Sequence, residues 1–268
     1  MKVVIDGNIN DEDEFLSVNN RAFQFGDGVF ETLLVHKNQI RFIEDHHSRL
    51  VDAMNSISLE STSFDLTNFQ NAIHSSLDVN GLKSGRVKYM VYRKSTDIPG
   101  YRTNTNEIET CVIVNHLINP QVLIHENVGL SKKVILNHSP FSAFKTMSSL
   151  PYVIAEIEKS ERDLHELIIN DTSGNVSECC SSNIFWIIDN QLYTPPLTTG
   201  CKAGIMRKQI MKTTDVIEQN IASNELLKAE TVFCTNIAKL GIFESIEGHK
   251  LSTSHPIIDQ IKPLWELL

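Results

Sequence analysis

Two ionisable residues stand in apolar stretches of the sequence, where a charge must be used or compensated. Lys145 lies in SAFKTMSSLPYVIA, just before an expected helix. An amine in such surroundings loses its proton readily and can then form a Schiff base with a carbonyl compound. Glu178 lies in NVSECCSSNIFW, a pattern typical of a β-strand, where a carboxylate must be paired or near solvent. The alternatives are a surface lysine and a glutamate on the outer face of a strand.

Two short segments predict binding sites for a phosphate group or another anion. LTTGCKAGIMR, residues 197–207, is a small glycine-containing loop that leads into an expected helix, whose first N–H groups lack helical partners. Thr235 and Asn236, at the end of an expected strand, form a second candidate. Arg49 falls where another expected helix would present its guanidinium to an anion. Each signal is weak alone, because many loops have a similar composition.

The spacing of cysteines and histidines predicts no metal site. The five cysteines stand at positions 111, 179, 180, 201 and 234. They form no CxxC pair and no metal-type combination with histidine. Cys179 and Cys180 would point to opposite faces of a strand, and the adjacent His46 and His47 diverge by about 100° on a helix. We therefore expect reduced, buried thiols, as in a cytosolic protein.

Composition indicates an acidic globular protein. The chain has 268 residues, of which 41% are hydrophobic and 21% charged, enough for one large domain or two modest ones. The 24 basic and 33 acidic residues give a net charge of −9, which disfavours nucleic acid and anionic membranes as partners. No stretch approaches the roughly 18 apolar residues of a membrane helix, and no signal-peptide core is evident. These features predict a soluble, cytoplasmic protein.

The elements that must position these residues fall into two halves. In the first half, hydrophobic periodicity predicts strands over 2–6, 29–36, 39–42, 86–93 and 107–115, and helices over 43–57 and 64–78. Periodicity is lost over 116–125. In the second half, strands are expected over 128–136, 166–170, 175–180, 183–188, 191–194 and 231–235, and helices over about 150–163, 204–214 and 224–229. This order predicts an α+β protein with two domains.

Taken together and in this order, the motifs resemble those of class IV pyridoxal-phosphate enzymes. That family includes D-amino-acid and branched-chain aminotransferases and 4-amino-4-deoxychorismate lyase. The matching segments are RAFQFGDGVFET, HHSRL, FKTMSSLPYVIA, GNVSECCSSNIFW, YTPPLTTGCKAGIMR and FCTN. They span nearly the whole chain, and ECCSSNIFW followed by GIMR is most similar to the lyase branch.

The resemblance implies pyridoxal 5'-phosphate as the cofactor. Lys145 matches the catalytic lysine that binds this cofactor covalently, and Glu178 matches the acid beside its pyridine nitrogen. The other matching cofactor contacts are Arg49, Ser182, Asn183, Ile205, Met206, Thr235 and Asn236. A carboxylate at Glu178 would keep the pyridine nitrogen protonated, and Lys145, once released, would move the Cα proton as a general base.

The resemblance also implies the two-domain α+β fold of D-amino-acid aminotransferases, with the cofactor between the domains. We expect an N-terminal α/β sandwich domain over 1–117, an interdomain linker over 118–125 and a C-terminal cofactor-binding α/β domain over 126–268. The family further implies a small-molecule substrate and a homodimer whose active sites take residues from both chains.

The loop after Arg93 departs from the family pattern. Relatives tend to have an arginine just before Gly-Tyr, whereas Pro99 precedes Gly100-Tyr101 here. That arginine would bind a substrate carboxylate, so the expected substrate-binding residues are Arg93, Tyr101 and Arg102.

Three functions fit the motifs. The first is 4-amino-4-deoxychorismate lyase, which releases pyruvate to give 4-aminobenzoate for folate synthesis. IAKLGIF after Asn236 lacks the Thr-Pro-Val ending common among the aminotransferases, which favours the lyase. The second is an aminotransferase acting on D- or branched-chain amino acids. The third is a catalytically silent binding protein on the same fold, and the intact pair of Lys145 and Glu178 argues against it.

Overall fold

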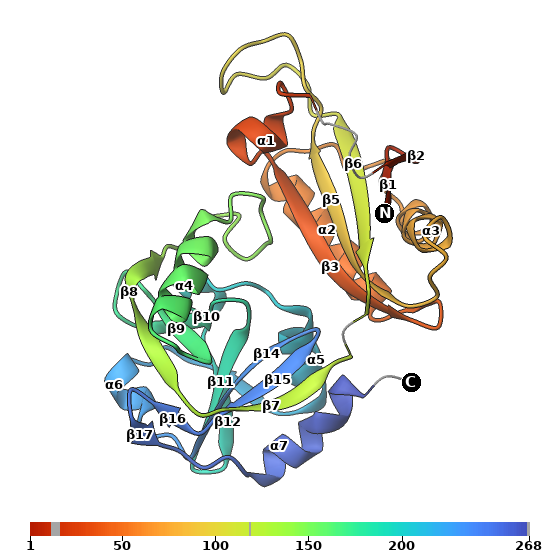
Figure 1. Cartoon of the computed structure of the whole chain (residues 1–268). Helices are drawn as coiled ribbons and strands as arrows, with labels where there is room; N and C mark the ends of the chain where they lie inside the picture. The colour runs from red at the N-terminus through yellow and green to blue at the C-terminus, as the bar shows by residue number, and fades with distance from the viewer. Residues whose placement is uncertain (12–16, 118, 267–268) are drawn as a thin grey trace. The chain divides into compact units, whose positions relative to one another are not determined.

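The computed structural model describes residues 1–11, 17–117 and 119–266. The chain divides into two compact units (Figure 1). Unit 1 comprises Met1–Ile118 and Phe144–Ser149, and unit 2 comprises Asn119–Ala143 and Leu150–Leu268. Both units combine helices with sheets, so the expected α+β class is confirmed.

Unit 1 contains a six-stranded antiparallel sheet with the strand order β2-β1-β6-β5-β3-β4. The strands are β1 (Lys2–Ile5), β2 (Asn8–Asp11), β3 (Gly28–His36), β4 (Gln39–Ile40), β5 (Gly85–Arg93) and β6 (Ile108–Asn115). The helices are α1 (Arg21–Phe25), α2 (Ile43–Ser56) and α3 (Leu66–Asp78). The long central strands β3 and β5 pair along eight residues each, from Gly28 opposite Tyr92 to Val35 opposite Gly85.

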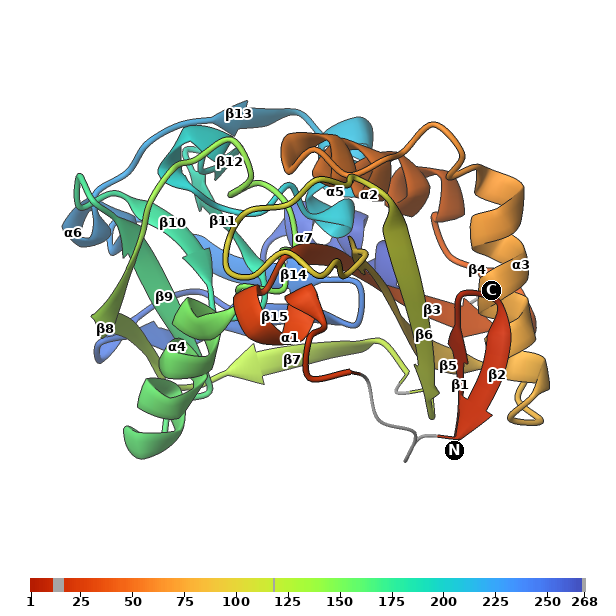
Figure 2. The ribbon, with the colours of Figure 1, turned by 90° about the horizontal axis from the view of Figure 1, so that it is seen from above.

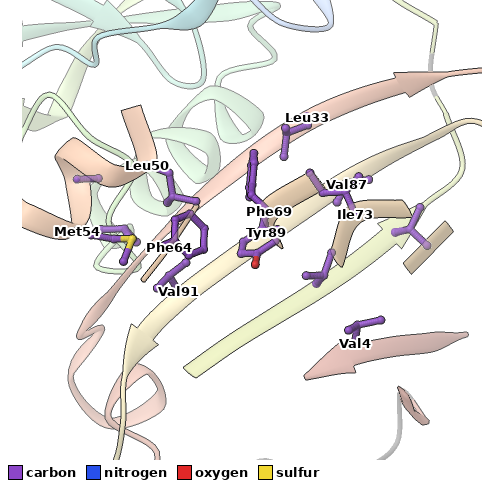
Figure 3. Packing of buried hydrophobic residues seen from close by; sticks show 14 of the residues in the cluster. Val4, Leu33, Leu50, Met54, Phe64, Phe69, Ile73, Val87, Tyr89 and Val91 are labelled. Atoms are coloured by element: carbon purple, nitrogen blue, oxygen red, sulfur yellow. The ribbon is translucent and has the colours of Figure 1, made fainter. Parts of the chain in front are cut away.

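One apolar core joins this sheet to α2 and α3. Leu50 and Met54 of α2 and Phe69 of α3 are buried against strand residues such as Val87 and Tyr89, as Figure 3 shows. Helical spacing places the first two on one face of α2. Burial of each such side chain contributes about 1.5–3 kcal/mol, so this core fixes α2 over the sheet.

Unit 2 contains two sheets. One has the order β10-β9-β8-β16-β17 and the other β13-β12-β11-β14-β15-β7. The strands are β7 (Gln121–His125), β8 (Val128–Leu136), β9 (Glu166–Asp171), β10 (Val176–Cys179), β11 (Asn183–Ile188), β12 (Gln191–Thr194), β13 (Val216–Glu218), β14 (Thr231–Asn236), β15 (Lys239–Phe243), β16 (Ser245–Ile246) and β17 (His249–Lys250). A shared core of side chains from both sheets, including Ile168, Ile184 and Phe243, holds them together.

The helices of unit 2 lie around these sheets. They are α4 (Leu150–Glu161), α5 (Ile205–Thr213), α6 (Ser223–Leu226) and α7 (Pro256–Ile261), with single 3-10 turns at Leu197–Thr199 and Lys262–Trp265. α4 packs on β8 and β9, and α5 packs on β14. Within the described ranges, no helix has both the length and the apolar character to cross a lipid bilayer.

The linker expected over 118–125 differs from the structure. Residue 118 lies outside the described residues, whereas Gln121–His125 forms β7, which pairs in parallel with β15 at the edge of its sheet (Figure 2). Its first four side chains are all exposed, so no alternation marks the strand in the sequence. The second domain, expected over 126–268, also loses Phe144–Ser149 to unit 1.

Candidate active site

The segment around Lys145 is fastened to β3 by its backbone. The Phe30 N–H donates to the Lys145 carbonyl at 2.8 Å, and the Met147 N–H donates to the Gly28 carbonyl at 2.9 Å. The Lys145 side chain is half-buried, with Nζ 5.4 Å from the centroid of the Phe30 ring. These contacts fix the lysine backbone and place its amine beside an aromatic ring.

Two glycines allow this close approach. A Cβ on Gly28 would lie 2.9 Å from the Met147 sulfur, and one on Gly26 would lie 2.5 Å from the Ser148 hydroxyl oxygen. Gly26 also has a φ of +66°, which disfavours other residues. The glycines of the FGDG motif therefore allow the segment around Lys145 to pack closely against the start of β3.

A buried cluster of Glu31, Arg49 and His46 lies in the same unit. Arg49 Nε and Nη2 each donate to a different oxygen of Glu31, both at 2.6 Å, and His46 Nδ1 lies 2.7 Å from Glu31 Oε2. Burial raises the pKa of Glu31, but Arg49 and then His46 outweigh it and lower the pKa to about 2. Arg49, the expected phosphate ligand, is thus a partner of Glu31.

The positive charge of Lys145 acts on His46 in this cluster. Burial lowers the pKa of His46 against the opposing attraction of Glu31, and the positive charges of Arg49 and Lys145 lower it further. The neutral ring therefore donates its Nδ1–H to Glu31. His46 Nε2 is buried and has no hydrogen-bond partner among the described residues. The negative charge of this cluster is therefore on Glu31, beside Arg49, and the cluster interacts electrostatically with Lys145.

The low pKa of Glu31 predicts a pH-dependent contribution to stability. Its pKa falls from 4.5 in the unfolded chain to about 2, which corresponds to about 3 kcal/mol of stability. This stability is present above pH 4.5 and is lost as the pH falls towards 2. We expect the difference in unfolding free energy between wild type and Glu31→Gln to shrink over that interval, as measured by urea unfolding with circular dichroism. Glu44→Gln, on the exposed side of α2, is the control. A difference that stays constant from pH 6 to pH 3 would contradict this assignment.

In unit 2, Glu178 is a buried carboxylate that accepts hydrogen bonds from Tyr152 and Lys202. Its side chain is 2% exposed. The Tyr152 hydroxyl donates to Oε1 at 2.5 Å, and the Lys202 N–H donates to Oε2 at 3.0 Å. Burial and the neighbouring Glu178 raise the pKa of Tyr152, so this hydroxyl stays protonated. Two elements, α4 and the loop before α5, therefore orient Glu178.

The N-terminus of α5 has the donors of an anion site. Its N-cap residue, Gly204, supplies no side-chain cap, and Ile205 and Met206 are the first helical residues. A Cβ on Gly204 would lie 1.9 Å from Asn183 Oδ1, so only glycine fits beneath Asn183. The register of β11 and β14 places Asn183 opposite Thr235, whose buried hydroxyl has no hydrogen-bond partner in the described part of the chain. Uncapped N–H groups and an unpaired hydroxyl suit a phosphate.

A side-chain hydrogen bond joins Ser182, just before β11, to Asn236, at the end of β14. The Asn236 amide donates to the Ser181 carbonyl at 3.1 Å and to the Ser182 hydroxyl at 3.2 Å. Its own oxygen accepts from the Ala238 N–H at 2.8 Å. Asn236 therefore joins two loops of unit 2, and the structure brings together the unit 2 residues that the sequence selected.

Arg93 does not have the geometry expected of a substrate ligand. Its Nε donates to the Asp27 carboxylate at 3.0 Å, and its side chain is 7% exposed. Its other two nitrogens donate to oxygens of Ile57, Ser58, Thr105 and Asn106. Because these bonds tie together the ends of loop 94–106, Arg93 is a positioning residue rather than a free guanidinium.

The tip of the same loop presents Tyr101 and Arg102 to solvent. Tyr101 is 87% exposed, and Arg102 is exposed as well. The buried Arg21 donates to the carbonyls of Gly100, Tyr101 and Arg102 at 3.1–3.3 Å. This contact fixes the backbone of the tip, while the exposed Tyr101 ring lies 5.2 Å from the Phe25 ring, centroid to centroid.

Sequence reasoning missed Tyr152, Glu31 and Arg21. Tyr152 stands in the SLPYVIA segment and Arg21 in the RAFQFGDGVFET segment, but neither has a local pattern that distinguishes it. Glu31 lies on the face of β3 that also buries Val29 and Leu33, where a carboxylate requires a partner. That signal resembles the one that identified Glu178.

Most of the chain is similar to known proteins in sequence and in fold. The profile of the amino-transferase class IV family matches residues 28–241. D-alanine aminotransferase of Bacillus licheniformis is 24% identical over 277 residues, 96% of this chain and 92% of that protein. Aminodeoxychorismate lyase of Bacillus subtilis is 25% identical over 237 residues, 85% of this chain and 80% of that protein. The structure of a branched-chain aminotransferase from Thermoproteus uzoniensis with norvaline superposes with a TM-score of 0.88 at 21% identity, covering 98% of this chain and 93% of that one.

Proposed function

The chain belongs to the class IV aminotransferase family, a family of pyridoxal-phosphate enzymes, and on that premise we propose that it is a lyase that converts 4-amino-4-deoxychorismate into 4-aminobenzoate and pyruvate. The choice between a lyase and an aminotransferase depends on the substrate loop of unit 1. Both reactions require the same residues around the cofactor.

The donor groups of unit 2 suit the phosphate and the pyridine nitrogen of pyridoxal 5'-phosphate. In unit 2, the α5 N–H groups of Ile205 and Met206 and the free hydroxyl of Thr235 suit the phosphate. Glu178, which accepts from the Tyr152 hydroxyl and the Lys202 N–H, would accept a hydrogen bond from the pyridine nitrogen. In unit 1, the Lys145 amine would hold the cofactor aldehyde covalently, and the Arg49 guanidinium, paired with Glu31, would add positive charge.

The cofactor, when bound, supplies an electron sink for the substrate Cα. Lys145 removes the Cα proton as the general base, and its backbone bonds to β3 limit the positions that the amine can reach. Glu178 would supply the negative charge that keeps the pyridine nitrogen protonated. In the lyase reaction the C–O bond to the enolpyruvyl group then breaks, the ring becomes aromatic, and the released enolpyruvate takes up a proton to become pyruvate.

The arrangement of loop 94–106 is the observation that favours a lyase over an aminotransferase. Arg93 is engaged at the base of the loop, whereas the exposed Tyr101 and Arg102 stand on a tip fixed by Arg21. An aromatic side chain beside a guanidinium suits a substrate that has both a flat ring and carboxylates. Aminodeoxychorismate has these groups, and a simple aliphatic amino acid has no ring.

The second candidate is a class IV aminotransferase for D- or branched-chain amino acids. The similarity to D-alanine aminotransferase, which extends over 96% of this chain, favours it. An aminotransferase returns the proton to the cofactor and requires a keto acid to complete its cycle, whereas a lyase requires no acceptor.

A product assay distinguishes the two candidates. We expect purified enzyme to release pyruvate and 4-aminobenzoate in equal amounts from aminodeoxychorismate without any keto acid. The turnover rate should be on the order of 0.1–1 s⁻¹ or higher. Half-transamination of D-alanine or leucine should be much slower, as measured from the cofactor absorption. If aminodeoxychorismate is inert while either amino acid rapidly converts the cofactor, the lyase assignment is wrong and the aminotransferase stands.

A further inference from the structure

Three side chains that commonly bind metal ions meet inside unit 2. They are His125 of β7, Glu166 of β9 and Cys234 of β14, and one ligand atom from each lies within 4.8 Å of the other two. All three are buried, with exposed fractions of 6%, 0% and 0%. No role in the proposed reaction uses any of them.

The histidine has an unsatisfied nitrogen that points to a missing ligand. His125 Nε2 is buried and makes no hydrogen bond of normal geometry within residues 1–11, 17–117 and 119–266, although the imidazole lies within hydrogen-bonding reach of the Cys234 thiol. A buried polar atom without a partner costs about 1–3 kcal/mol. A bound cation would use the lone pair of this nitrogen in place of a hydrogen bond.

Gly241 allows two of the three donors to approach its backbone closely. It lies opposite Cys234 in the pairing of β14 with β15. A Cβ at this position would lie 2.3 Å from His125 Nε2 and 3.0 Å from the Cys234 sulfur. The absence of a side chain here keeps the imidazole and the thiol close together.

The carboxylate retains the capacity to bind a cation. Glu166 Oε2 accepts from Lys239 Nζ at 2.6 Å, and Oε1 accepts from the Leu167 N–H at 3.1 Å. A carboxylate has about four lone-pair positions, so these two bonds do not exhaust it. The Cys234 sulfur lies 3.8 Å from Oε2. With a thiolate at Cys234, the site would have two negative charges, from Cys234 and Glu166, against the one positive charge of Lys239.

We propose that His125, Glu166 and Cys234 bind a zinc ion as three protein ligands, an arrangement in which the ion keeps its fourth position open. Imidazole, carboxylate and thiolate are the ligand types that Zn²⁺ takes in proteins, and a thiolate disfavours Mg²⁺ and Ca²⁺. Binding displaces the thiol proton and involves no redox change. The ion would connect strands of both sheets of unit 2, and Cys234 directly precedes Thr235 on β14. This inference is independent of the proposed function.

Metal content and a cobalt probe test the site in the full-length protein. We expect about one zinc per chain in protein expressed with zinc, measured by elemental analysis after gel filtration. Protein equilibrated with Co²⁺ should show the thiolate-to-cobalt charge-transfer absorption. Cys234→Ser should abolish that band and weaken binding by more than about 100-fold. Cys111→Ser, which removes a buried cysteine of unit 1, should leave both unchanged.

Further measurements keep the test decisive if Cys234→Ser does not fold. Gly241→Ala should also lower metal occupancy, because its methyl group would displace the imidazole. Zinc should raise the melting temperature of wild type and of Cys111→Ser. A wild-type protein that binds no stoichiometric metal, or that binds Co²⁺ without the thiolate band, overturns the proposal. The same holds if folded Cys234→Ser retains the band.

Discussion

Lys145→Ala is expected to lower turnover by about 10⁴-fold or more and to abolish covalent attachment of the cofactor. The backbone of residue 145 would keep its hydrogen bond to Phe30, so the fold should survive while the amine is lost. Borohydride reduction followed by peptide mapping measures attachment, and a steady-state assay measures turnover.

Lys88→Ala is the matched control for this change. Lys88 Nζ lies 4.6 Å from the same Phe30 ring centroid, but Lys88 is exposed on β5. Its removal should leave attachment intact and turnover within about threefold of wild type. If the reduced cofactor is found on a lysine other than Lys145, the assignment of the catalytic lysine fails.

Glu178→Gln is expected to lower turnover by about 10²-fold or more while the cofactor stays bound. The amide keeps the shape of the carboxylate, its oxygen can still accept from the Lys202 N–H, and the Tyr152 hydroxyl can rotate to accept from its nitrogen. What is lost is the negative charge opposite the pyridine nitrogen. Turnover and the cofactor content of the purified variant separate these effects.

Tyr152→Phe provides the graded comparison. It removes one donor to Glu178 but leaves the charge, so turnover should fall much less than in Glu178→Gln. Equal losses in the two variants would indicate that orientation rather than charge is what Glu178 contributes. Wild-type turnover in Glu178→Gln with full cofactor content would refute the electron-sink role.

Local sequence was sufficient for much of the fold. Periodicity of two predicted the central strands, and periodicity of about 3.6 predicted α2 and α3, because burial of one face is recorded along the chain itself. The motifs around Lys145 and Glu178 were also visible, since a charged residue in an apolar stretch is a local anomaly. These features determined the family and the residues selected for the site.

Only the tertiary structure decided which partner each polar group has. β7 escaped prediction because its exposed side chains do not alternate and its pairing is with β15, far along the sequence. Arg93 was predicted to bind the substrate, but its guanidinium is occupied by hydrogen bonds to Thr105 and Ile57. Cysteine spacing predicted no metal site, yet strand pairing brings His125, Glu166 and Cys234 together from three separate strands. Local pattern records how deeply a residue is buried, whereas contacts between distant segments depend on how the sheets pack.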